Sequence, residues 1–249
     1  MGANQKSLAD SFLRYFSAEI ASTPENDAEA YRLRYRVYCE EFGYEPAENF
    51  PNRAETDDFD SHAINCLIRH KGSNLTAGCI RVVTADDDRQ LPLERFCLNS
   101  IYGDYRDLLQ GDRHQLTEFS RLAVDHNFRR RPREAMTRIG GGLGEEISVD
   151  EERTFPLIAV ASFLGAFAIA ELLGRRHVFA MMEPFLPRML KRSGILPESA
   201  GEQIDYHGLR AAYFITPDTA IDGLKPDLHM LYQAIRASMD PQDLPQHKT

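Results

Sequence analysis

Apolar and polar residues recur along the chain with two different periods. In residues 16–20 every second side chain is apolar, which is the period of a half-buried strand. Residues 62–70 and 76–84 are joined by Gly-Ser-Asn turn residues, which predicts a β-hairpin. The remaining strands are predicted at residues 116–124, 177–182 and 203–216.

Helices are predicted between these strands. Asn26 and Glu29 have the spacing of a capping box, so we expect a helix to begin there and to end at Gly43. The apolar run 156–173 predicts a buried helix, because it is shorter than the ~20 residues that cross a membrane. Two shorter helices are predicted at residues 185–192 and near 228–239.

The order of these elements favours one α/β domain. A strand, a helix and a strand in succession over residues 116–182 predict a parallel crossover. We expect an N-terminal extension with the first strand (residues 1–26), a single catalytic-type domain (27–216) and a C-terminal tail with a short helix (217–249).

The charge balance limits the classes of partner. The chain has 38 acidic and 29 basic residues and a formal net charge of −9. Nucleic-acid-binding proteins generally carry a basic face, so no nucleic-acid partner is expected. The four cysteines lack CxxC or Cys/His spacing, which predicts no metal site. No secretory signal precedes them, so we expect reduced thiols in a cytoplasmic protein without a membrane span.

A series of charged and aromatic residues follows the order of a known family. An arginine, an aromatic residue four positions later and a second aromatic six further on precede a D-x-x-D motif, a strand arginine and an E-x-S-R motif. This series resembles the acyl-homoserine-lactone (autoinducer) synthases. The matching residues are Arg34, Tyr38, Tyr44, Asp57, Asp60, Arg81, Glu118, Ser120 and Arg121.

A closer resemblance is to the acyltransferases associated with the PEP-CTERM/exosortase system and to long-chain N-acyl amino acid synthases. The shared motifs are R-L-R-Y-x-V-Y-C-E-E from residue 32, S-R-L-A-V from 120, F-R-R-R from 128 and F-A-M-M-E-P from 179. The resemblance extends over most of residues 31–214 and leaves out both ends. It implies a GNAT-like, three-layer α/β (α+β) fold with a mixed, splayed central sheet flanked by helices.

The same resemblance implies an N-acyltransferase of bacterial type. The donor would be a fatty acyl thioester of an acyl carrier protein or of coenzyme A, the acceptor a small amine such as an amino acid, and no cofactor would be bound permanently. Both aromatic positions after Arg34 are Tyr, where the autoinducer synthases prefer Phe and Trp, and residues 140–152 form a longer stretch. These departures argue against S-adenosylmethionine as the acceptor.

Acyl transfer to an amine needs a base, and two glutamates are candidates. Because side chains alternate along a strand, Glu118 and Ser120 are expected on one face and Arg121 on the other. Glu118 is the first candidate for taking a proton from the ammonium, with Ser120 orienting it. An ion pair with an arginine is the alternative role for Glu118. Glu183, at the end of the following strand, is the second candidate base.

The remaining motif residues are placed at the substrate site by the resemblance. Arg34 and Arg81 are expected either to hold a substrate carboxylate or to pair with the acidic loop. Arg121 is expected to organise the carboxylates of that loop. The full substrate-binding set is Arg34, Tyr38, Tyr44, Asp57, Asp60, Arg81 and Arg121.

Backbone amides and the arginines that follow them are expected to bind the thioester. In related folds the strand at 116–124 separates from its neighbour and presents N–H groups to the carbonyl. The basic run after it favours recognition of coenzyme A phosphates or docking of an acidic carrier protein, with a solvated loop as the alternative. The residues for this role are Leu122, Ala123, Val124, Arg129, Arg130 and Arg131. Residues 140–152 are expected to form a glycine-rich mobile loop.

Two other functions stay open from the sequence. One is an acyl-homoserine-lactone synthase that uses S-adenosylmethionine, and the other is a non-catalytic module that binds acylated carrier protein. An enzyme releases thiol from an acyl thioester only when an amine is present, which a binding module does not. The product then separates a lactone from an acyl amino acid.

Overall fold

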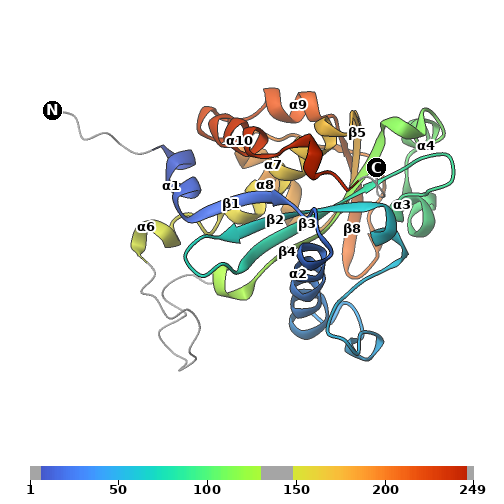
Figure 1. Cartoon of the computed structure of the whole chain (residues 1–249). Coiled ribbons are helices and arrows are strands. Elements are labelled where there is room, and N and C mark those ends of the chain that lie inside the picture. Colours follow the sequence, from blue (N-terminus) through green and yellow to red (C-terminus); the bar gives the residue numbers. More distant parts are fainter. Residues whose placement is uncertain (1–6, 130–147, 246–249) are drawn as a thin grey trace.

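A mixed sheet of eight strands forms the centre of the protein (Figure 1). The structure, a computed structural model, describes residues 7–129 and 148–245. The strands lie in the order β1-β2-β3-β4-β5-β8-β6, with β7 paired to β8, and β4 pairs with β5 in parallel while the other described pairs are antiparallel. The strands are β1 (Phe16–Ile20), β2 (Ala63–His70), β3 (Thr76–Thr84), β4 (Leu116–Val124), β5 (His177–Met182), β6 (Glu198–Ser199), β7 (Ile204–Asp205) and β8 (Leu209–Ile215).

Helices cover both faces of this sheet, which gives three layers (Figure 1). Helix α7 packs on β1 to β4 with α10 above it, and α2 packs on the opposite face. The helices are α1 (Leu8–Tyr15), α2 (Pro24–Arg34), α3 (Pro92–Phe96), α4 (Gly103–Leu109), α6 (Val149–Glu152), α7 (Leu157–Leu172), α8 (Phe185–Ser193), α9 (Pro217–Asp222) and α10 (Pro226–Ser238). No helix within the described ranges is long and apolar enough to cross a membrane.

Helix α7 lies unusually close to the sheet because small residues form the contact. A Cβ atom on Gly165 would lie 2.3 Å from the Cys66 Sγ of β2. In return, Gly78 of β3 leaves room for Ile158, whose Cγ2 would lie 2.7 Å from an added Cβ. The predicted buried helix is thereby confirmed, and its apolar character reflects burial on nearly all sides.

The helix that carries the first motif residues begins earlier than predicted and changes to a π-helix before its predicted end. The cap is Thr23, whose hydroxyl accepts from the Asn26 N–H at 3.3 Å, so the predicted capping box at Asn26 is wrong. After α2 the chain continues as a π-helix (Tyr35–Glu41), in which the Phe42 N–H donates to the Val37 carbonyl at 3.1 Å. Such widened turns recur at functional sites. Gly43 then ends the helical segment as predicted, with φ +63°.

The other predicted strands and the parallel crossover from β4 through α7 to β5 are confirmed. The single strand predicted at residues 203–216 is instead two strands, β7 and β8, which pair with each other. The prediction of a glycine-rich loop at residues 140–152 has a different outcome. Residues 140–147 lie outside the described residues, and the remainder of the expected loop includes helix α6.

Candidate active site

The joint between β4 and β5 is open over half its length. The two strands pair only from Leu116 to Glu118 on β4 and from His177 to Phe179 on β5, within the residues that the structure describes. Beyond that point the strands separate, and their outer halves line a cavity of about 1060 Å³. The splayed sheet expected from the sequence is therefore present.

This cavity passes from one face of the sheet to the other. Phe163 of α7 lines it on one face, and Tyr38 of the π-helix lines it on the opposite face, where α2 packs. Apolar side chains line the α7 side, and we call this part the apolar pouch: Phe119, Phe128, Phe155, Phe163, Leu186 and Met189. Polar side chains line the other part, which we call the polar mouth: Tyr38, Tyr44, Ser120, Arg121, Glu183 and Arg210.

A carboxylate and a guanidinium face each other in the polar mouth. Met182, the last residue of β5, pairs with Ala211 of β8, so Glu183 and Arg210 each lie one position beyond this pair. The Glu183 Oε1 lies 3.4 Å from the Arg210 Nη2 and accepts from the Tyr44 hydroxyl at 3.3 Å. The Arg210 guanidinium also lies over the Tyr44 ring, 5.4 Å from its centroid.

Tyr38 connects the π-helix to the free part of β4. Its hydroxyl donates to the Leu122 carbonyl at 2.9 Å, and the Arg121 guanidinium lies over its ring at 5.6 Å. Burial raises the pKa of Tyr38, so the phenol keeps its proton and remains a donor. This contact fixes the backbone of β4 at the cavity wall.

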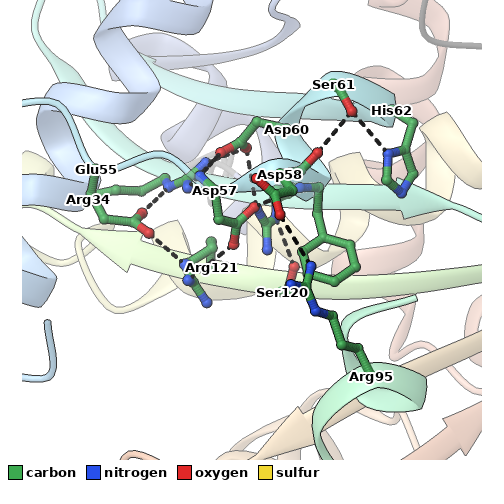
Figure 2. A network of polar contacts seen from close by, with 12 residues as sticks. Arg34, Glu55, Asp57, Asp58, Asp60, Ser61, His62, Arg95, Ser120 and Arg121 are labelled. Atoms are coloured by element: carbon green, nitrogen blue, oxygen red, sulfur yellow. Dashed lines mark hydrogen bonds and ion pairs between the residues drawn. The ribbon is translucent and has the colours of Figure 1, made fainter. Parts of the chain in front are cut away.

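At the polar mouth and behind it, three arginines and three carboxylates form a largely buried network (Figure 2). Figure 2 shows Glu55 between two arginines: it accepts from the Arg34 Nε at 2.5 Å and from the Arg121 Nε at 3.0 Å. Arg34 also donates both terminal nitrogens to Asp60, at 2.7 and 3.0 Å. Arg81 is the third arginine of the network. Such bidentate pairs are among the strongest hydrogen bonds in proteins.

Arg81 completes this network from β3. It donates to the Asp57 Oδ1 at 2.5 Å, to the Asp60 Oδ1 at 3.2 Å and, through Nε, to the Ser120 hydroxyl at 3.0 Å. Arg34 and Arg81 are fully buried, and neither lines the cavity. Of the two roles left open for them, the structure shows pairing with the acidic loop.

The charges of this network hold its carboxylates ionised. Burial alone would raise the pKa of Asp60, but the guanidinium groups of Arg34 and Arg81 outweigh it and hold the pKa well below its usual range. The pKa values of Glu55 and Asp57 are lowered in the same way, against burial, by their arginine partners. The network is therefore a rigid, charged support for the polar mouth.

Ser120 and Arg121 lie on the same side of β4, contrary to the expected alternation. The register between β3 and β4 shifts where Cys79 and Arg81 face Ala123 and Ser120, and Arg121 has φ +52°. This is the geometry of a β-bulge, which places two successive side chains on one face. Arg121 thereby donates to Asp57 at 3.1 Å and organises the acidic loop as predicted.

Glu118 is buried too deeply to contact a substrate in the cavity. Only 2% of it is exposed, it does not line the cavity, and its Oε2 accepts from the Leu93 N–H at 2.8 Å. Burial raises its pKa to about 8. Of the two candidate bases, Glu183 borders the cavity and Glu118 does not.

The expected thioester-binding residues divide into three groups. Leu122, Val124 and Arg129 line the cavity. Ala123 packs toward α2 instead. Arg129 pairs with Glu41 and lies 5.1 Å from the centroid of the Phe42 ring at the rim. Arg130 and Arg131 lie outside the described residues.

Two site residues were missed by the sequence analysis. Glu55 is the central carboxylate of the network, and no motif singled it out because it precedes the D-x-x-D pattern. Arg210 lies in a predicted strand without a motif, and the residues around it, L-R-A-A-Y-F-I, do not alternate between polar and apolar, so no sequence signal marked it.

Comparisons with known proteins agree with this architecture. A sequence profile of the acetyltransferase (GNAT) domain matches residues 33–138. No curated protein is significantly similar in sequence. Among solved structures, TofI in a ternary complex with an inhibitor and MTA is similar, with a TM-score of 0.59 and 18% identity over 91% of this chain and 99% of TofI.

Two further solved structures have this fold and a stated activity. FeeM, an N-acyl amino acid synthase from uncultured soil microbes, gives a TM-score of 0.56 and 16% identity over 86% of this chain and 97% of FeeM. BjaI, a coenzyme-A-dependent acyl-homoserine lactone synthase with MTA, gives a TM-score of 0.57 and 12% identity over 90% of this chain and 93% of BjaI. These likenesses confirm the GNAT-like fold expected from the sequence.

Proposed function

We propose that this chain, whose fold is that of GNAT-type acyltransferases, transfers a fatty acyl group from a carrier thioester to the amine of a small acceptor, an amino acid. The observation that carries the proposal is the cavity between β4 and β5. It joins an apolar pouch to a charged polar mouth through the splayed sheet. An acyl chain fits the first environment and a polar amine the second, so that the two substrates meet between the strands.

The chemistry assigned to the cavity is direct attack on the thioester. The amine nitrogen forms a bond to the carbonyl carbon, and the C–S bond then breaks. Unpaired backbone N–H groups of β4 near Leu122 are the proposed donors to the oxyanion. Of the two protons that the acceptor ammonium loses, the first passes to Glu183 and on to solvent, and the second goes to the departing thiolate.

Glu118 is proposed as a positioning residue rather than the base. With a pKa raised to about 8 by burial, it holds a proton at neutral pH and makes a poor proton acceptor there. Its bond to the Leu93 N–H instead ties β4 to the start of α3. Ser120, held by Arg81, keeps the bulge in place beside the cavity.

The carrier of the acyl group is proposed from the charge at the cavity rim. Helix α8 begins at the cavity with Phe185 and carries the exposed cations Arg188, Lys191 and Arg192. Within the described part of the chain, Lys191 and Arg192 have no acidic partner at ion-pair distance. In a protein of net charge −9, this local excess favours an acidic acyl carrier protein or the phosphates of coenzyme A. The association with the PEP-CTERM/exosortase system and the cytoplasmic location stay predictions.

The proposal is tested by thiol release from dodecanoyl-coenzyme A and from dodecanoyl acyl carrier protein, with and without amino acids. We expect release that requires the amino acid, together with an acyl amide detected by mass spectrometry. Release without any amine, or none at all, would refute the proposed transfer. A lactone formed from S-adenosylmethionine would establish the alternative synthase.

The base is tested by substituting each glutamate. We expect Glu183→Gln to lower kcat by roughly 100-fold or more, which is the usual contribution of general base catalysis. Glu202→Gln, an exposed carboxylate outside the cavity, is the matched control and should keep the wild-type rate. If Glu118→Gln loses turnover and Glu183→Gln does not, proton transfer belongs to Glu118.

A further inference from the structure

Arg210 is held in the cavity by fewer contacts than any arginine of the buried network. Its side chain is 15% exposed, and in the described part of the chain its one ion pair is the 3.4 Å contact between Nη2 and Glu183. Its Nε is buried and has no hydrogen-bond partner among the described residues. By contrast, Arg34 donates from Nε and from both terminal nitrogens. One edge of the Arg210 guanidinium therefore has an N–H donor without an acceptor.

A buried N–H group without an acceptor is unfavourable. The acceptor that best fits this edge of an arginine is a carboxylate. The Nε and Nη2 of an arginine form a fork that matches the two oxygens of a carboxylate. A bound carboxylate would supply the acceptor that this donor lacks. The nearest carboxylate, Glu183, reaches the Nη2 alone and is itself shared with the Tyr44 hydroxyl.

We infer that Arg210 and Glu183 form the acceptor site and recognise the two charges of an α-amino acid, the carboxylate on Arg210 and the ammonium on Glu183. This inference rests on the proposed function. An α-amino acid carries both charges on adjacent positions, and the charged groups of Glu183 and Arg210 lie 3.4 Å apart in the polar mouth. When a zwitterion binds, the 3.4 Å contact between Arg210 and Glu183 is replaced by two contacts with the substrate, one from Arg210 to its carboxylate and one from its ammonium to Glu183.

The charge of the pair also selects against other ligands. A phosphate dianion that reached Arg210 would be repelled by Glu183, which lies 3.4 Å from the guanidinium. An amine without a carboxylate would satisfy Glu183 and leave the Arg210 Nε unpaired. Arg121, the other cation of the polar mouth, is already paired with Glu55 and Asp57 and is therefore not available for the acceptor.

The site is tested with matched acceptors that differ by the carboxylate alone. Tyrosine is compared with tyramine, and leucine with 3-methylbutylamine, at saturating dodecanoyl-coenzyme A. For the wild type we expect kcat/KM to favour each amino acid by roughly 10- to 100-fold, the range for hydrogen bonds to charged groups. In Arg210→Gln this preference should fall to near unity through a higher KM for the amino acid, while the KM for the thioester is unchanged.

Two further variants keep the test decisive. Arg210→Lys keeps the charge but not the fork, so it should restore only part of the preference. Arg176→Gln, an exposed arginine at the opposite end of β5, is the control and should keep the wild-type preference. Unchanged thermal midpoints identify variants that fold.

The outcomes separate this inference from the proposed function. If the wild type acylates both members of each pair equally well, or if Arg210→Gln keeps the preference, the acceptor site lies elsewhere although the transfer itself stands. If neither amino acids nor amines are acylated, the proposed transfer fails as well.

Discussion

Two glutamates close to the joint of β4 and β5 have opposite environments. Glu118 is enclosed by protein and accepts one backbone N–H, whereas Glu183 is 34% exposed and faces a guanidinium and a phenol. Desolvation penalises the ionised form of Glu118, whereas Glu183 stays in contact with solvent. Two residues of the same type are therefore suited to different tasks.

The burial of Glu118 gives a pH-dependent stability. The unfolded chain releases this proton near the ordinary pKa of 4.5, whereas the folded protein keeps it up to about 8. Between these values the folded state binds more protons, so wild-type stability falls as pH rises. Glu118→Gln removes this effect. We expect its free energy of unfolding, relative to wild type, to increase between about pH 5 and about pH 8 by up to ~1.4 kcal/mol per pH unit.

This change is measured by urea denaturation at both pH values. Glu202→Gln serves as the exposed control, and its difference from wild type should stay constant with pH. A constant difference for Glu118→Gln as well would mean that the residue ionises normally in the folded protein.

Individual side chains show how far the sequence could predict the site. The spacing of the motif residues correctly indicated that Arg121 and the acidic loop belong together. It did not indicate that Arg34 and Arg81 are sealed behind the cavity while Arg210 borders it. Depth below a surface depends on how β8 and the π-helix pack against β4 and β5, which no local pattern records.

At the scale of elements, the contact between α7 and the sheet depends on two glycines. The added Cβ in Gly165→Ala would meet the Cys66 Sγ at 2.3 Å and the Met239 Cε at 3.3 Å. Because both neighbours are buried, the helix must shift, and we expect a loss of ~1–3 kcal/mol in unfolding free energy.

Gly103 provides the matched control for this substitution. It begins α4, and nothing lies within 4 Å of an added Cβ. Gly103→Ala should therefore be neutral or stabilise by up to ~1 kcal/mol. Chemical denaturation of both variants decides the matter: a Gly165→Ala protein as stable as Gly103→Ala would show that α7 can move away from β2 without cost.

The sequence predicted regular elements better than the irregular ones that form the site. Strands β4 and β5 were predicted with the bounds that they have. The bulge at Arg121 and the π-helix at Tyr35–Glu41 were not predicted. Each interrupts an otherwise regular hydrogen-bond pattern, and contacts between residues distant in sequence hold this region, such as the bond between Tyr38 and Leu122.

At the scale of the whole molecule, the cavity predicts the kinetic mechanism of the reaction. The apolar pouch and the polar mouth lie on opposite faces of the sheet, so both substrates can be bound at once. The thiols are poor candidates for a covalent intermediate, because all four are buried and burial raises the pKa of Cys39 and of Cys97 to about 11. We therefore expect a ternary complex without an acyl-enzyme.

Initial rates at varied thioester and amino acid concentrations test this ternary-complex mechanism. Double-reciprocal plots should intersect. Parallel lines, or an acylated protein found by mass spectrometry after incubation with thioester alone, would contradict direct transfer and would call for a nucleophile in the cavity.

Because the cavity runs through the sheet, the determinants of chain length and of acceptor choice are carried by different layers of the molecule. Phe163 belongs to the helical layer that contains α7, and Arg210 on β8 belongs to the sheet. Changes at sites without shared partners usually combine additively. New pairings of lipid tail and head group could thus be assembled, by selection or by engineering, from independent substitutions on the two sides.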